Sequence, residues 1–333
     1  MKKKLVYLLF LLPLLTVSQY TDVINSNRPG QSVSAYAVGK NVLQTEFGIV
    51  YEKQEHRDLL TTANRLGGEL VVRYGLLFEE LEISWEGTYL SEKKSYASLE
   101  EEITNVNFTK HRAGLKYLIY DPFKDPEKNK PNLLSWRANN VFQLKNLIPA
   151  VSLYGGANFN LGDNPFYPED PTISYRGMLA TQSRLSPKFV LITNIIYDRI
   201  GTDFPEMSYI VSITRGLKNP KWSVFIENQG IKSDRYADIL LRTGIAHLFN
   251  DRLQADINFG ASFKHTPSQF YATMGASYRF DFHKDKLVPI QDQKAGENGS
   301  PIKKNSMKKK KIKKKNRKKG KKKKPSDNGV IDF

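Results

Sequence analysis

The 333-residue sequence contains no cysteine. It therefore has no disulfide, thiolate nucleophile, cysteine-based zinc site or lipid-modified cysteine. It also lacks an apolar run of about twenty residues, the length that a membrane-spanning helix requires. The longest apolar run, residues 5–15, is interrupted by Pro13. These absences exclude a disulfide-stabilised domain and a helical membrane protein.

Residues 1–18 have the parts of a secretory signal peptide. Lys2, Lys3 and Lys4 precede an apolar region of about eleven residues, and small residues follow at Thr16 and Ser18. We expect export with cleavage after Ser18; an uncleaved anchor is the alternative.

Basic charge is concentrated at the end of the chain. Residues 303–324 contain 16 Lys and Arg and no acid. The residues after Phe282 include 19 basic and five acidic residues and so carry a net charge of +14, and the first four residues carry +3. Because the whole chain has a formal net charge of +17, the net charge of residues 5–282 is zero. The high isoelectric point therefore describes a tail and not a fold.

From about residue 41 the dominant hydrophobic period is two. In residues 41–52 one face carries Leu43, Phe47 and Ile49, and the other carries Gln44 and Glu46. Strict alternation of this kind predicts strands with one dry and one wet face. The expected strands lie near residues 41–52, 62–74, 81–90, 110–120, 149–161, 173–183, 188–198, 206–215, 221–229, 234–248, 252–263 and 269–282.

These strands favour a transmembrane antiparallel β-barrel of about twelve strands, because many have the roughly ten residues that a tilted strand needs to cross a bilayer. Short turns alternate with longer polar loops at 53–61, 91–109, 162–172 and 199–205. One connection, 121–148, breaks the pattern, and its residues 131–146 predict a short amphipathic helix. A secreted β-sandwich is the alternative. Two features favour the barrel: polar residues on nearly every strand's second face, and aromatic residues near strand ends, at Tyr51, Tyr74, Tyr89, Tyr197, Tyr209, Trp222 and Tyr278.

The last predicted strand carries a recognisable terminal pattern. Residues 271–282 alternate without interruption and resemble the terminal-strand insertion signal of bacterial outer-membrane barrels. The polar, glycine and two aromatic positions of that signal are occupied by Thr273, Gly275, Tyr278 and Phe280. In such barrels the signal usually ends the chain, whereas 51 residues follow Phe282 here.

Residues from about 25 to 282 also resemble a family of outer-membrane transporter-like barrels named for the meta-pathway of phenol degradation. The segments that carry the resemblance are 25–52, SPKFVLITNIIYDRI, FIENQG and YADILLRTGIAHLFNDRLQADINFGAS. The family name implies transport of aromatic or other small compounds and gives no substrate for this chain.

The wet faces supply candidate pore-lining residues, because charges are costly against lipid and belong in a hydrated interior. A barrel of twelve strands is intermediate in width between small barrels, whose interior is filled by side chains, and large barrels, which enclose a wide channel. A narrow channel is favoured, and an ion-paired, sealed lumen is the alternative. The candidates are Glu46, Glu69, Glu82, Glu86, Arg112, Lys116, Glu227, Asp238, Arg242, Asp256 and Arg279.

We expect no cofactor, metal site or enzymatic activity. The five histidines show no metal-ligand spacing, and no nucleophile elbow or phosphate-binding glycine loop is present. The leading function is therefore a passive outer-membrane channel or transporter for small molecules. The alternative is a structural barrel whose tail docks peptidoglycan or a periplasmic partner.

The two segments outside the predicted barrel of residues 41–282 are expected in the periplasm. Residues 19–40 form either a loose leader or a partial plug. Residues 283–333 form a lysine-rich, disordered tail, because dense like charges repel each other. An even strand count and an exported N-terminus place both ends on the periplasmic side, away from nucleic acid. The expected partners are outer-membrane lipid, the outer-membrane assembly machinery and, through the tail, peptidoglycan or a periplasmic protein; a possible docking end is Val330, Ile331 and Phe333.

Overall fold

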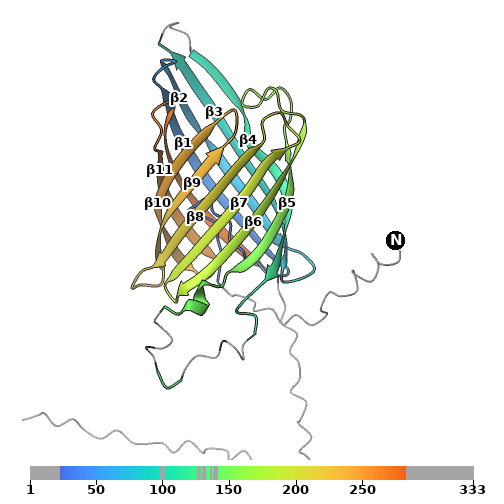
Figure 1. Ribbon diagram of the computed structural model, residues 1–333, viewed down its shortest axis with the longest axis vertical. Coiled ribbons are helices and arrows are strands. Elements are labelled where there is room, and N and C mark those ends of the chain that lie inside the picture. Colours follow the sequence, from blue (N-terminus) through green and yellow to red (C-terminus); the bar gives the residue numbers. More distant parts are fainter. Residues whose placement is uncertain are drawn as a thin grey trace, which may run out of the picture. The chain divides into compact units, whose positions relative to one another are not determined.

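The computed structural model describes residues 23–97, 102–125, 129, 133–135, 137 and 142–282, which form a closed antiparallel barrel of twelve strands (Figure 1). Each strand pairs with its neighbours in sequence, and β1 pairs with β12 to close the barrel. The predicted fold class is thus confirmed. The strands are β1 Val42–His56, β2 Thr61–Gly75, β3 Leu81–Tyr96, β4 Glu102–Tyr120, β5 Ala150–Phe159, β6 Ile173–Ser186, β7 Phe189–Ile200, β8 Glu206–Gly216, β9 Trp222–Lys232, β10 Ala237–Asn250, β11 Leu253–Ser262 and β12 Ser268–Asp281.

The barrel has its polar residues inside and its apolar residues outside. The largest fully buried side chains include Arg73, Arg279 and Lys116, whereas Phe47 and Met274 are 54% and 58% exposed. Because side chains alternate along a strand, the same parity that buries the charges turns an apolar face outward. This is the arrangement that a bilayer requires of a barrel with a polar interior.

Aromatic side chains lie on the outer surface toward both ends of the barrel. Trp222 and Tyr278 are exposed near one end, and Tyr51 and Tyr197 are exposed toward the other. We call the first the turn end, because the strands there are joined by β-turns such as 187–188 and 251–252, and the second the loop end.

The predicted loop at 91–109 is wrong in its extent. β3 and β4 continue beyond the predicted strands and leave only residues 97–101 between them, so their hairpin rises above the other strands in Figure 1. Ser91, Lys93 and Ser95 occupy the outward positions of this extension. With polar residues on both faces, the hairpin carries no alternation signal, which is why periodicity missed it. The predicted loops at 53–61 and 199–205 are shortened in the same way.

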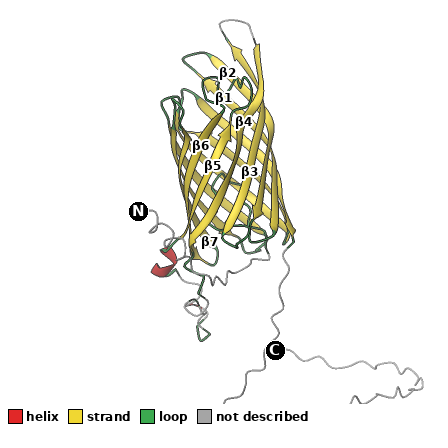
Figure 2. Cartoon of the chain, turned by 90° about the vertical axis from the view of Figure 1, so that its right-hand side faces the viewer, coloured by secondary structure: helices red, strands yellow, loops and turns green. Residues whose placement is uncertain are grey.

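The connection between β4 and β5 lies at the turn end. It contains a 3-10 helix, η1 (Leu144–Leu147), shown in red in Figure 2. The side-chain amide of Asn146 donates to the carbonyl oxygen of Leu185 at the end of β6, at 3.2 Å. Seven of the sixteen residues of the helix predicted over 131–146 fall outside the described residues, and residues 144–146 belong to η1. In the described part of the chain, no helix combines the length and apolarity needed to cross a membrane.

Candidate functional site

The described part of the N-terminal segment, residues 23–40, lies inside the barrel. It enters at the turn end, where the Ile24 amide donates to the Asp251 carbonyl oxygen at 2.8 Å. It then extends inward to Gln31 and returns to β1. Within residues 23–40 the chain forms no strand or helix. Its backbone groups therefore need partners from the barrel wall.

Carboxylates of the barrel supply many of these partners. Glu227 accepts from the amides of Gln31 and Ser32 at 3.1 and 3.0 Å, and Glu82 accepts from the Val38 amide at 2.9 Å. Amide side chains do the same on other strands. Asn194 on β7 accepts from the Val33 amide at 2.7 Å and donates to the Val33 carbonyl at 2.9 Å. The segment is thus bonded to opposite sides of the barrel.

Arg28 is the charged centre of the segment. Its guanidinium pairs with Glu69 of β2 and with Asp256 of β11, the latter at 3.0 Å. Both carboxylates and the guanidinium are largely buried, so each charge is compensated by a partner, as burial requires. The network links the segment to two strands on either side of the β1–β12 closure.

Two glycines make room for Arg28. Gly48 on β1 and Gly275 on β12 are opposite each other in the strand register. A Cβ atom at Gly48 would lie 2.5 Å from Arg28 Nη1, and one at Gly275 would lie 2.6 Å from Arg28 Cζ. Such approaches are far inside van der Waals contact. Gly275, which the sequence suggested as part of an insertion signal, therefore also has a packing role.

A second ionic cluster closes the turn end. Arg73 donates to Glu82 through Nε at 3.0 Å and to Glu46 through Nη1 at 3.1 Å. Lys116 Nζ lies 3.2 Å from Glu82 and donates to the carbonyl oxygens of Ser34 and Tyr36, each at 3.0 Å. The cluster joins β1, β2, β3 and β4 to the returning arm of the segment.

Below Gln31 the interior is filled. A cavity lined by Asn27, Val33 and Lys116, among other residues, has a volume of about 10 Å³, which is room for about one water molecule. Val33 also packs against a buried apolar group made of Tyr154, Met178, Ile196 and Ile210. The segment is thus held by apolar contacts as well as by charges.

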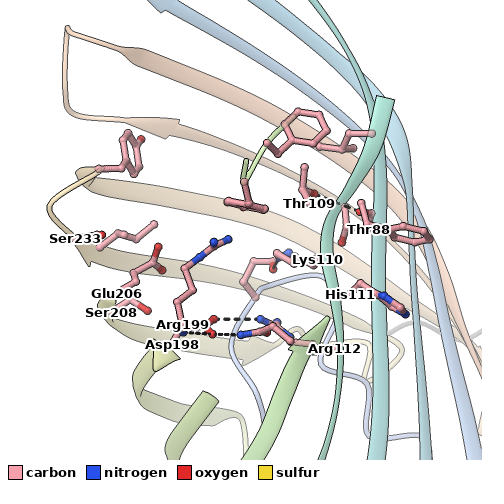
Figure 3. A pocket seen from close by; sticks show the side chains of 18 of the residues that line it. Thr88, Thr109, Lys110, His111, Arg112, Asp198, Arg199, Glu206, Ser208 and Ser233 are labelled. Atoms are coloured by element: carbon pink, nitrogen blue, oxygen red, sulfur yellow. Dashed lines mark hydrogen bonds and ion pairs between the residues drawn. The ribbon is translucent and has the colours of Figure 1, made fainter. Parts of the chain in front are cut away.

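Above Gln31, at the loop end, lies a cavity of about 460 Å³ (Figure 3). Side chains from strands all around the barrel line it, and Gln31 forms part of its floor. In Figure 3, Asp198 lies between the β4 residue Arg112 and the β7 residue Arg199. Asp198 pairs with Arg176 and lies 3.6 Å from Arg112 Nη1.

The connection 160–172 between β5 and β6 lies over this cavity. Its Asp170 pairs with Arg199 at the end of β7 and with Arg235 between β9 and β10, the latter at 3.2 Å. The Arg199 guanidinium lies 3.5 Å from the centre of the Tyr167 ring. The side-chain amide of Asn164 donates to the Phe108 carbonyl oxygen of β4 at 2.8 Å. These contacts hold the connection across the loop end.

All of the pore-lining candidates face the interior. Five of the acids contact the N-terminal segment: Glu46, Glu69, Glu82, Glu227 and Asp256. The other candidates contact wall residues or the segment's carbonyl oxygens; Glu86 pairs with Arg112, Arg242 with Glu227, Asp238 with Tyr236, and Arg279 donates to Val23. Whether they line a conducting pore stays a prediction.

Several residues of the candidate site were not singled out from the sequence. Arg73 and Lys110 have the same strand parity as the chosen candidates Glu69 and Arg112, so the alternation signal was available for them. Arg28 had no such signal, because it lies in a segment without secondary structure.

The remaining predicted residues divide between the two faces and the undescribed tail. On β12, Thr273 is buried inside, whereas Tyr278 and Phe280 are 38% and 41% exposed outside. The side chains match the polar-in, aromatic-out pattern of the suggested insertion signal, whose role stays a prediction. The possible docking end, Val330, Ile331 and Phe333, lies outside the described residues, as do residues 1–22. Among the described residues, no group of three or more His, Cys, Asp and Glu side chains is placed to hold a metal ion.

Comparison with solved structures finds other barrels. An outer-membrane channel from Pseudomonas putida F1 has a TM-score of 0.48 at 12% identity, covering 77% of this chain and 100% of that one. The translocator domain of the autotransporter NalP from Neisseria meningitidis has a TM-score of 0.44 at 8% identity, covering 73% and 89%. The KdgM porin has a TM-score of 0.39 at 11% identity, covering 70% and 99%. A comparison with curated protein sequences gives no match.

A family profile matches residues 26–280, which span the segment inside the barrel from Ser26 onward and nearly all of the twelve strands. The lysine-rich tail lies beyond the match. The chain therefore belongs to the family described as "Putative MetA-pathway of phenol degradation".

Proposed function

We propose that the protein is an outer-membrane channel for small molecules whose turn end is closed by residues 24–38. The observation that carries this proposal is the division of the lumen at Gln31. Above it lies the cavity of about 460 Å³, and below it the lumen is filled by a segment without regular structure. A sealed structural barrel would not need such a cavity.

A membrane location follows from the two surfaces of the barrel. A bilayer does not tolerate an unpaired sheet edge, because its backbone groups would lack hydrogen-bond partners. The closed hydrogen-bonded ladder of this barrel leaves no such edge. The outer face is apolar, and the buried charged side chains lie inside, most of them in ion pairs. In the family's setting this supports contact with outer-membrane lipid after insertion by the assembly machinery.

The segment is suited to move without disturbing the barrel. It is bonded to the wall mostly by side chains, whereas the wall is held by its own strand ladder. Displacing residues 24–38 would therefore break ion pairs and side-chain hydrogen bonds and leave the strand pairing intact.

The positions of the first and last described residues support an orientation in which the turn end faces the periplasm. Ile24 bonds to Asp251 in the β10–β11 turn, and the Phe282 amide donates to the Asn41 carbonyl oxygen at 3.1 Å. Residues 24 and 282 thus lie at the same end of the barrel. With an exported N-terminus, that end faces the periplasm and the loop end faces outward.

The test is single-channel conductance in planar bilayers, comparing the full chain with a chain that lacks residues 24–38. We expect discrete channels in both and a larger unitary conductance in the deletion. Migration on denaturing gels before and after boiling confirms that each chain still forms a barrel.

The outcomes separate the alternatives. Folded barrels that are silent in both forms would favour the structural-barrel function and its docking tail. Equal conductance in both forms would show that the segment does not obstruct the pathway.

A further inference from the structure

Charged side chains make up much of the lining of the loop-end cavity. Seven basic and five acidic side chains line it. The acids are Glu52, Glu69, Asp170, Asp198 and Glu206. Carboxylates outside the lining pair with further bases: Glu92 with Arg65 and Glu227 with Arg242. The cation of interest is therefore the one that has no carboxylate partner in the described part of the chain.

Most of these acids are already engaged by arginines. Asp198 is shared by Arg112 and Arg176, and Asp170 is shared by Arg199 and Arg235. Each place also has a second carboxylate outside the lining: Glu86 pairs with Arg112, and Glu169 lies 3.7 Å from Arg235. The guanidinium groups at both places are therefore compensated. Of the five acids, Glu206 alone has no ion pair among the described residues.

Lys110 is the basic residue of the cavity without a carboxylate partner among the described residues. It extends from β4 into the cavity in Figure 3, and its ammonium donates to Gln31 Oε1 at 3.0 Å. A neutral amide compensates an ammonium only in part. Lys110 therefore remains available to an anion at the floor of the cavity.

Two further donors line the same cavity without a partner in the described part of the chain. They are Arg242 Nε and the Tyr271 hydroxyl, on side chains whose residues are each 6% exposed. The Arg242 guanidinium lies 5.0 Å from the centre of the Tyr271 ring. Arg242 also pairs with Glu227, which binds the Gln31 amide, so these donors and Lys110 surround one residue of the N-terminal segment.

Apolar rings complete the lining. Phe108, Phe159, Phe166 and Phe204 belong to the wall or to the connections over the cavity. Rings beside a cationic floor suit a solute that carries an apolar body and one negative group.

We propose that the loop-end cavity is a binding site for small carboxylates with an apolar body, with Lys110 as the principal contact of the carboxylate. This inference rests on the proposed channel function and names the class of solute that the channel takes up. Occupancy would replace the Lys110–Gln31 bond and so weaken one tie of the N-terminal segment.

The test is isothermal titration of the detergent-solubilised full chain with three probes that each carry one small polar group on a benzene ring: benzoate, benzyl alcohol and benzylammonium. We expect benzoate to bind most tightly, because all three probes share the ring and benzoate alone carries a carboxylate that can pair with Lys110. Equal binding of all three, or no benzoate binding, would overturn the proposal.

Variants identify the contact. Lys110→Gln is expected to weaken benzoate binding about tenfold, the order of magnitude for one charge-assisted bond. The matched control, Lys232→Gln, removes the same charge from an exposed position on β9 outside the cavity lining, and its binding should equal that of the unaltered chain. Glu206→Gln removes the unpaired acid and should tighten binding. Unchanged affinity in Lys110→Gln would overturn the assignment of Lys110.

Gel migration before and after boiling shows whether each variant is folded. If Lys110→Gln does not fold, the three-probe comparison and Glu206→Gln decide the proposal without it. If the protein conducts but does not prefer benzoate, this inference is wrong and the proposed channel function is unaffected. A protein that binds benzoate but never conducts overturns the channel.

Discussion

Ser26 Oγ and Ser277 Oγ lie 2.7 Å apart inside the barrel, although 251 residues separate them in sequence. Ser26 belongs to the N-terminal segment and Ser277 to β12, the last strand. The pair is therefore a direct bond between the segment inside the lumen and the wall at the barrel closure.

This pair allows the segment to be locked. Because the chain has no cysteine, Ser26→Cys with Ser277→Cys would introduce the only two thiols. Two hydroxyl oxygens at this separation are near enough for a disulfide with small shifts of the side chains. We expect oxidation to lower the conductance of the double variant and a reductant to restore it. The control is Ser277→Cys alone under the same oxidant. If the conductance of the double variant is the same under oxidising and reducing conditions, the segment stays in place while the channel is open.

The buried ionic cluster at the turn end is expected to be essential for stability. Arg73 and its partner Glu82 have side chains that are 1% and 3% exposed. Arg73→Met would leave Glu46 and Glu82 without their main cation, and breaking a buried pair in this way costs about 3–5 kcal/mol. The measurement is the urea concentration at which the heat-modifiable band is lost.

A matched control exists on the same strand. Arg65 pairs with Glu92 at 2.7 Å but is 21% exposed. Arg65→Met is expected to cost about 1 kcal/mol or less, because solvent screens that pair. Equal losses for Arg65→Met and Arg73→Met would contradict the role assigned to the cluster.

The two faces of β9 are expected to respond differently to a new charge. Ile226 is 51% exposed on the outer face, and Gln229 lines the loop-end cavity three residues away. Ile226→Arg places a cation against lipid near mid-strand, at a cost of about 2–4 kcal/mol. Gln229→Arg places it in the polar interior and should insert nearly as well as the unaltered chain. Folding yield into lipid vesicles measures both, and similar yields would mean that Ile226 does not contact lipid.

The tail is expected to act independently of the barrel. The described strands end at Asp281, so a chain truncated after Phe282 should fold and insert normally. The 19 basic residues beyond that point should bind polyanions in a salt-dependent manner, at about 1 kcal/mol for each residue that reaches an anionic surface.

A pull-down of peptidoglycan and periplasmic proteins with residues 283–333 tests this expectation. The comparison is with the same segment lacking its last four residues, which include Val330, Ile331 and Phe333. If the shorter segment still binds peptidoglycan in a salt-sensitive manner, the tail binds electrostatically and the proposed docking end is not needed. A periplasmic protein that binds the full segment but not the shorter one would support the docking end.

The sequence by itself determined the barrel. Residues such as Phe47 and Glu46 alternate because a strand turns successive side chains to opposite faces, and this period is local. It therefore predicted twelve strands and the face of each candidate residue. It failed at the β3–β4 hairpin, where Lys93 and its neighbours are polar on both faces and no contrast remains to be detected.

Only the tertiary structure decided what fills the lumen. Arg28 lies in a segment without periodicity, and its partners Glu69 and Asp256 are 41 and 228 residues away. The sequence showed charges on the inner faces, but it did not show which of them face the N-terminal segment and which face the loop-end cavity. That division depends on barrel closure, which brings β1 beside β12, and on the two glycines that leave space for Arg28. Contacts between residues so distant in sequence arise only when the whole chain has folded.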